Sequence, residues 1–109
     1  MRLLVYKIWE NYLMNQYSLE FDKKASKDIL SLDKSTRNFI LDELENFINN
    51  FDEAYEKELI KLTKIKVLQG EFKGLYRLKL RTYRVVYEKI NNKLVILVLR
   101  VSHRKDVYR

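Results

Sequence analysis

The sequence predicts an α+β domain in which a strand and two helices precede a three-stranded antiparallel meander, with the helices on one face of the sheet. Apolar and polar residues alternate in three successive segments from Leu75 onward, which is the pattern of half-buried strands. An earlier segment, from Ile40 to Phe51, carries apolar residues at helical spacing. The chain has 109 residues, 47% of them apolar, so it can bury one modest core. We therefore expect an antiparallel sheet of about four strands with one face open.

The first strand and the first helix follow each other closely. Tyr17–Phe21 alternates and is rich in strand-forming residues, which favours a strand. Asp22 then stands where a helix N-cap is expected. After it, Ala25, Ile29 and Leu32 fall at positions i, i+4 and i+7, so a short amphipathic helix should bury one face.

The second helix has the strongest helical pattern in the chain. Asp33 is its expected cap, and the helix should run from Lys34 to about Asn50. The Ile40–Phe51 stripe is its core face, and its acidic residues should be ordinary solvated surface. Residues 52–62 could add a further helical turn or form a charged connection.

The meander follows a turn region bracketed by Gly70 and Gly74. Arg81-Thr82 should be a tight link, and Asn91-Asn92 a hairpin turn, because Asn tolerates positive φ. The last strand is the most apolar and should be central. The three strands are expected at Leu75–Leu80, Tyr83–Lys89 and Leu94–Val101.

Charge is distributed very unevenly along the chain. Residues 1–60 hold 8 Lys and Arg against 12 Asp and Glu, a net charge of −4. Residues 61–109 hold 14 against 3, a net charge of +11. A small domain that gathers positive charge onto one sheet is suited to meet a polyanion.

Composition excludes several classes of site. The chain has no Cys and one His, so it can form neither a disulfide framework nor a site of several histidines. It contains no glycine-rich phosphate-loop pattern and no apolar stretch long enough to span a bilayer, and we expect a cytoplasmic protein. Residues 1–13 are expected to be an N-terminal extension or a mis-annotated start before Met14, and residues 14–109 the domain itself.

The candidate site lies on the strands of the meander. Alternation places Arg77 and Lys79 on one face, and Arg84 should lie across the hairpin from them. His103 and Arg104 follow the last strand. An uncovered sheet face lined in this way would be a cationic groove, because guanidinium groups bind phosphate oxygens with two parallel hydrogen bonds.

Such a groove suits metal-free RNA cleavage, in which the 2′-hydroxyl attacks the adjacent phosphate. The reaction needs a base for the 2′-hydroxyl, positive charge on the phosphate and an acid for the leaving 5′-oxygen. Like charge nearby lowers the pKa of a lysine. Lys79, which stands among arginines, is therefore the candidate base.

The segments KVLQGEFKGLYRLKLRTYRVVYE and LVILVLRVSHRKDVY resemble the RelE/ParE superfamily of bacterial and archaeal toxins, and specifically its RelE branch. The resemblance extends from about Tyr17 to Tyr108. It implies a RelE-like toxin domain of a type II toxin–antitoxin system. Such a toxin enters the ribosomal A site, cuts messenger RNA without a cofactor or metal, and is neutralised by an acidic RelB-like antitoxin.

The resemblance also implies roles for individual residues. Lys79, Arg84, Arg104 and Tyr108 match catalytic positions, and Arg77 matches a position where the family usually has lysine. Because arginine cannot act as a base at neutral pH, any base role falls on Lys79.

Arg81 and His103 are weaker candidates for substrate contact. Arg81 is the arginine we most expect to be a bystander, and a lone histidine seldom acts by itself. Two other functions stay open: a ParE-like inhibitor of DNA gyrase on the same fold, without nuclease activity, and a catalytically silent RNA-binding or antitoxin-docking protein.

Overall fold

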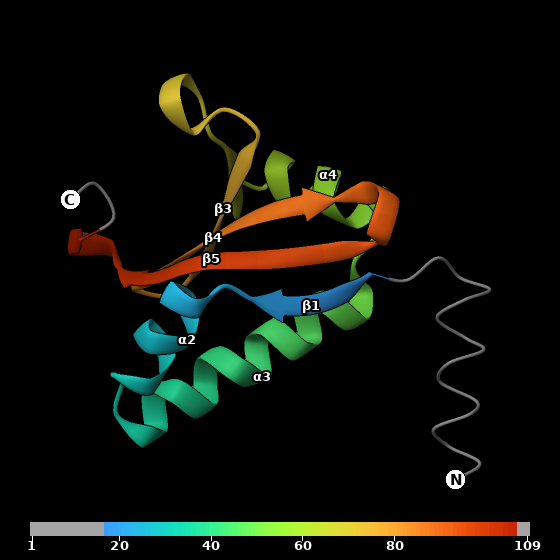
Figure 1. The fold of residues 1–109 in the computed structure, drawn as a ribbon. Helices are drawn as coiled ribbons and strands as arrows, with labels where there is room; N and C mark the ends of the chain where they lie inside the picture. The colour runs from blue at the N-terminus through green and yellow to red at the C-terminus, as the bar shows by residue number, and fades with distance from the viewer. Residues whose placement is uncertain (1–16, 107–109) are drawn as a thin grey trace, which may run out of the picture.

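A computed structural model of the chain describes residues 17–106, which form three helices and a five-stranded mixed sheet (Figure 1). The strand order is β1-β5-β4-β3-β2. The elements are β1 (Ser18–Phe21), α2 (Lys23–Leu30), α3 (Lys34–Asn50), α4 (Glu53–Lys61), β2 (Ile65–Val67), β3 (Leu75–Leu80), β4 (Tyr83–Ile90) and β5 (Val95–His103). Short 3-10 turns occupy Gly70–Phe72, Asn91–Lys93 and Arg104–Asp106.

All three helices begin at an aspartate whose side chain caps the first turn. Asp22 accepts a hydrogen bond from the backbone N–H of Lys24, and Asp33 accepts one from Thr36, as the sequence predicts. Asp52 accepts one from the N–H of Tyr55 at 2.7 Å. This cap makes Glu53–Lys61 a true helix, where the sequence left open a charged connection.

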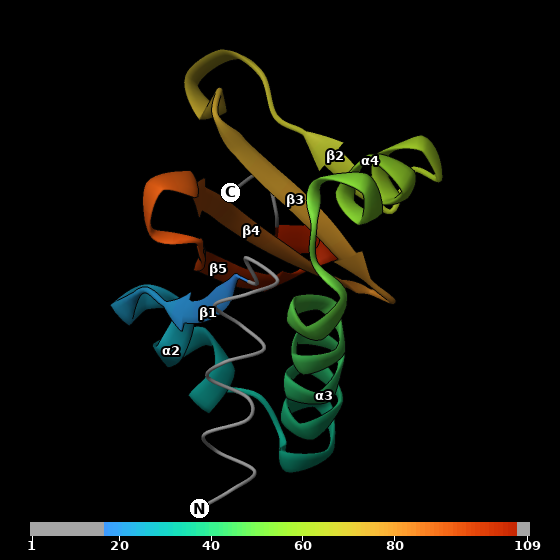
Figure 2. The same cartoon turned by 90° about the vertical axis from the view of Figure 1, so that its right-hand side faces the viewer.

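The sheet differs from the expected antiparallel one in two ways. β1 pairs with β5 in parallel, and β2 is an additional edge strand that pairs antiparallel with β3 (Figure 2). β5 therefore lies between β1 and β4, and the middle strand is β4. At the Asn91-Asn92 turn the residue with positive φ is Leu94, at 53°, and not an asparagine.

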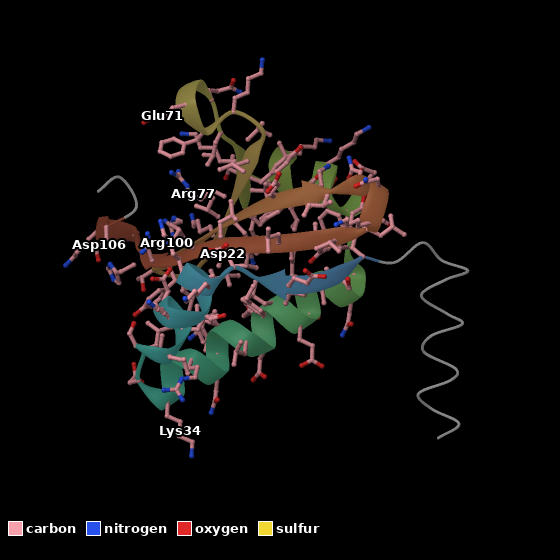
Figure 3. All side chains as sticks on the ribbon, in the orientation of Figure 1. Asp22, Lys34, Glu71, Arg77, Arg100 and Asp106 are labelled. Carbon is pink, nitrogen blue, oxygen red and sulfur yellow. The ribbon has the colours of Figure 1, made fainter. Side chains whose placement is uncertain are left out.

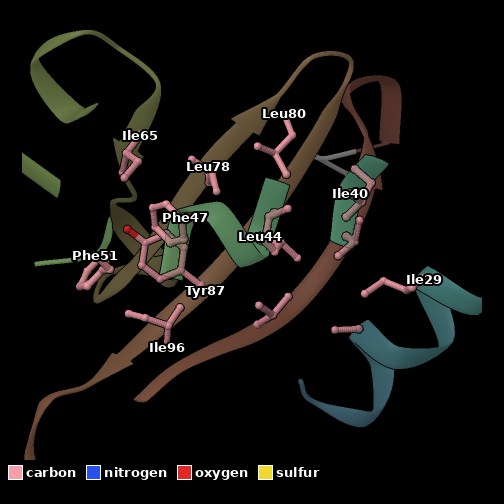
Figure 4. Close-up of a cluster of buried hydrophobic side chains, with 14 residues drawn as sticks. Ile29, Ile40, Leu44, Phe47, Phe51, Ile65, Leu78, Leu80, Tyr87 and Ile96 are labelled. Carbon is pink, nitrogen blue, oxygen red and sulfur yellow. The ribbon is translucent and has the colours of Figure 1, made fainter. Parts of the chain in front are cut away.

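One face of the sheet and the helices enclose the core (Figure 4). Ile40, Leu44 and Phe47 of α3 pack against alternate residues of the strands, including Leu78 and Val85. Tyr87 is part of this core, and Tyr76 and Tyr83 pack against it. Arg77 and Lys79 have the opposite phase in β3, so α3 does not cover them.

A bulge in β5 shapes the open face. Tyr87 pairs with Val98 and Val86 pairs with Arg100, so Leu99 is an extra residue in β5. The Asp28 carboxylate of α2 secures the bulge: it accepts two hydrogen bonds from the Arg100 guanidinium, at 2.8 and 3.1 Å, and one from the backbone N–H of Val101 at 2.8 Å.

The expected boundary between residues 1–13 and the domain falls outside the described residues. Among residues 17–106, no helix combines the length and the apolar character that crossing a bilayer requires.

Candidate nucleic-acid interface

The open face of β3 and β4 brings the predicted cations together. Lys79 of β3 is the register partner of Arg84 of β4, and Arg77 lies two residues along on the same face. In the other direction across the sheet, Arg77 is the partner of Lys66 of β2. Cross-strand partners on one face have Cβ atoms about 4.5–5.5 Å apart, so these side chains can share one ligand.

Two hollows meet at Arg77 and Arg84. The first, of about 550 Å³, lies toward the β2 edge and is lined by Lys64, Lys66 and Lys79 as well as these two arginines. The second, of about 470 Å³, lies toward the end of β5 and includes Arg100. A ligand in either hollow would therefore be within reach of the two shared guanidinium groups.

Arg84 is positioned by the turn between β3 and β4. Its Nη1 atom donates hydrogen bonds to the backbone carbonyls of Arg81 at 2.8 Å and of Tyr83 at 3.0 Å. Arg81 has a φ of 55°, in the left-handed region. These two hydrogen bonds restrict the rotamers of Arg84, so its guanidinium is already positioned at the open face before any ligand binds.

Lys64 and Lys66 were missed from the sequence. Lys66 lies in β2, and the backbone carbonyl of Lys64 accepts a hydrogen bond from the N–H of Lys79 at 2.9 Å. The available signal was the alternation in IKV after α4, but three residues are too few to establish a strand period.

Arg81 and His103 lie away from this cluster. The Arg81 guanidinium stands 4.1 Å from the ring centroid of Phe39 in α3. The His103 ring makes an edge contact with Tyr83, with centroids 5.4 Å apart, and its Nδ1 atom accepts a hydrogen bond from the Lys105 N–H. Phe39 and Tyr83 both pack against the core, so Arg81 and His103, which contact them, lie on the helix-covered side of the sheet.

Arg104 begins the last 3-10 turn and is exposed, and its backbone N–H donates to the Thr82 carbonyl at 2.7 Å. This bond holds the chain after β5 beside the β3–β4 turn, next to Arg84. Tyr108 lies outside the described residues. Within residues 17–106, no three His, Cys, Asp or Glu side chains are grouped so that they could hold a metal ion.

The helix-covered side carries a buried ionic network that the sequence did not predict. Glu56 of α4 is 3% exposed; one carboxylate oxygen accepts from the Tyr87 hydroxyl and the other from the Lys89 ammonium, both at 2.6 Å. Burial alone would lower the pKa of Lys89, but the hydrogen bond and charge of Glu56 raise it. Burial and the same carboxylate raise the pKa of Tyr87.

Solved structures of RelE toxins resemble this fold. The isolated RelE toxin of E. coli is 30% identical over 84% of this chain and 90% of that one, with a TM-score of 0.58. The toxin–antitoxin complex RelBE2 from Mycobacterium tuberculosis contains a chain that is 25% identical over 82% of this chain and 99% of that one, with a TM-score of 0.57. An archaeal RelE–RelB complex from Pyrococcus horikoshii, at 23% identity and a TM-score of 0.61, shares the fold over 84% of this chain and 99% of that one.

No curated protein sequence matches the chain. A family model does match: that of the ParE toxin of type II (ParDE) toxin–antitoxin systems, over residues 19–108. The match covers nearly the whole region in which the sequence resembles these toxins, and the sheet topology agrees with it. The chain therefore belongs to the RelE/ParE superfamily of type II toxin–antitoxin toxins.

Proposed function

We propose that this toxin is a ribosome-dependent endoribonuclease that cuts messenger RNA in the A site without a metal ion. One observation carries the proposal: Lys79 stands directly opposite Arg84 on the uncovered face of the sheet, with Arg77 beside them. Cations gathered on an exposed face attract a polyanion, and guanidinium groups bind phosphate oxygens with two parallel hydrogen bonds. The backbone of messenger RNA is such a polyanion.

In the proposed reaction, the 2′-oxygen of one nucleotide attacks the phosphorus that links it to the next. Lys79, in its neutral form, takes the 2′-hydroxyl proton, and the bond from phosphorus to the 5′-oxygen breaks. The departing 5′-oxygen takes a proton from water and Lys79 returns its own proton to water, so the products are a 2′,3′-cyclic phosphate and a 5′-hydroxyl. Arg77 and Arg84 hold the phosphate oxygens while negative charge develops on them.

The chain after β5 supplies the remaining groups. Arg104, held beside the β3–β4 turn, assists the departing 5′-oxygen or stabilises the transition state. Tyr108 orients the base or the nucleophile, in keeping with the resemblance of the C-terminal motif to RelE toxins. His103 and Arg81 have contacts on the covered side, so we assign them no contact with substrate.

The natural partner is proposed to be an acidic, RelB-like antitoxin that folds on the toxin surface. The similar chains from Mycobacterium tuberculosis and Pyrococcus horikoshii are in complexes with antitoxins. The net charge of +11 on residues 61–109 favours an acidic partner. The ribosome as the place of action implies a cytoplasmic protein.

A second function is supported by the family match itself. The matching model describes ParE toxins, and a ParE-like member would inhibit DNA gyrase without cutting RNA. The cluster of Arg77, Lys79 and Arg84 favours the nuclease, since the chemistry above uses each of these side chains.

Expression of the chain in bacteria separates the two functions. A nuclease should stop translation within minutes, and primer extension should map new 5′ ends inside codons of translated messengers. A gyrase inhibitor should leave messengers intact and induce the response to DNA damage. Intact messengers together with that response would overturn the proposal.

A further inference from the structure

The loop between β2 and β3 presents an aromatic side chain at the edge of the second hollow. Phe72, in the 3-10 turn Gly70–Phe72, is 52% exposed although it is a large apolar residue. Gly70 and Gly74, with φ of 66° and 94°, adopt conformations that residues with a Cβ rarely take. The loop stands away from the body of the sheet, with Glu71 at its outer end (Figure 3).

The groove beneath this loop combines an apolar floor with a cationic rim. Its volume is about 470 Å³, within the range of small-ligand sites. The aliphatic side chains that line the groove come from the loop and from the strands, and they include the bulge residue Leu99. Asp106 supplies a carboxylate at the far end of the groove. Figure 3 shows Arg77 between the loop and the end of β5, where Arg100 and Asp106 lie. The apolar lining is Leu68, Phe72, Leu75, Val86 and Leu99.

We propose that Phe72 stacks on an unpaired base of the RNA strand that the toxin cuts, and that this groove is the site for that base. The proposal rests on the nuclease function proposed above. Aromatic side chains beside a cationic groove are the usual means of holding single-stranded nucleic acid, because every base has an apolar face and every nucleotide a phosphate.

Because the two hollows are connected, the position of the cut phosphate in one hollow determines which base lies in the other. Arg77 and Arg84 line both of them, so a strand whose scissile phosphate lies beside Lys79 and Arg84 runs on into the groove under Phe72. The next base can then lie between the Phe72 ring and the aliphatic floor. At the far end of the groove, Asp106 can accept a hydrogen bond from an exocyclic amino group.

Binding of short single-stranded oligoribonucleotides, measured by fluorescence anisotropy at low salt, tests this inference. Phe72→Tyr and Phe72→Trp keep a stacking ring, whereas Phe72→Leu keeps apolar volume without one. We expect the first two variants to bind as the unchanged chain does, and Phe72→Leu and Phe72→Ala to bind roughly 5- to 150-fold more weakly. Thermal unfolding should be unaffected, because Phe72 is half exposed.

An oligonucleotide series with one abasic position each locates the partner of Phe72. At a single position, loss of the base should weaken binding to the unchanged chain but not to Phe72→Leu. Equal RNA binding by all variants would overturn the stacking inference alone. The same holds if Phe72→Leu binds RNA as the unchanged chain does but captures an acidic antitoxin more weakly. An unchanged chain that binds no oligoribonucleotide would overturn the inference too, whereas failure of the nuclease function would show separately, as intact messengers on ribosomes.

Discussion

On the helix-covered face of the sheet Lys89 forms a buried ion pair with Glu56, whereas on the open face of the same strands Lys79 and Arg84 lie side by side. Lys89 of β4 meets Glu56 at 2.6 Å under α4. Five residues earlier in β4, Arg84 faces Lys79 across the hairpin. One strand thus carries a neutralised pair on its covered side and part of a positive cluster on its open side.

The difference indicates which charges serve the fold and which serve a ligand. A buried pair with satisfied hydrogen bonds needs no further partner, and removing either member leaves an uncompensated charge. A cluster of cations on an exposed face instead presents positive charge to an anionic ligand. Substitutions on the covered face should therefore act on stability, and those on the open face on activity.

The largest effect is expected from Glu56→Ala. This change leaves Lys89 and the Tyr87 hydroxyl without their shared acceptor, and should lower the free energy of unfolding by about 3–5 kcal/mol. Glu53→Ala is the matched control, since Glu53 is 60% exposed and 3.4 Å from Lys89, and it should cost about 0–1 kcal/mol. Denaturant unfolding measures the free energy of unfolding of both variants. Equal decreases in that free energy would show that the buried pair of Glu56 and Lys89 contributes no more than the exposed one.

The next effect is expected from Arg84→Ala, measured as cutting of messenger on ribosomes. Loss of one preorganised positive charge at the phosphate should reduce the rate by about 10²–10³-fold. Arg81→Ala is the control: its guanidinium stacks on Phe39, so cutting should continue at the normal rate. Since Arg84 also bonds two turn carbonyls, thermal unfolding must show that the variant remains folded. A similar loss for both variants would count against the assignment.

A smaller effect is expected at alkaline pH. The pKa values of Lys89 and Tyr87 are raised in the folded chain, so folding holds both protons more tightly than the unfolded chain does. The resulting stability is complete below the unfolded pKa values of about 10 and is lost as pH rises above them. Unfolding followed between pH 9 and 11 should show this decline in the unchanged chain and a flatter profile in Glu56→Gln. If the free energy of unfolding depends on pH in the same way in both proteins, Glu56 does not raise the pKa values of Lys89 and Tyr87.

Local patterns were sufficient to predict much of this arrangement. The caps at Asp22 and Asp33 and the helix Lys34–Asn50 follow from short-range rules, and the structure confirms them. The face shared by Arg77 and Lys79 follows from strand alternation. Arg84 follows from the tight link before it, because a two-residue turn fixes the register of a hairpin.

Features that depend on distant pairing could not be predicted. The parallel pairing of β1 with β5 joins segments about 75 residues apart, and β2 is too short to show a period. The burial of Glu56 depends on where α4 packs, which its own sequence does not specify. His103 was grouped with the open face because β5 was expected to end at Val101; the strand continues to His103, which alternation then directs to the covered side.

The central claim is that the open-face cations cut RNA through its own 2′-hydroxyl, and a single substituted messenger tests it most directly. A ribosome-bound messenger with one 2′-deoxy sugar at the mapped cut site lacks the nucleophile and keeps every phosphate contact. The account predicts that it binds as the unsubstituted messenger does and resists cutting at that position. Cutting at the normal rate would contradict the account.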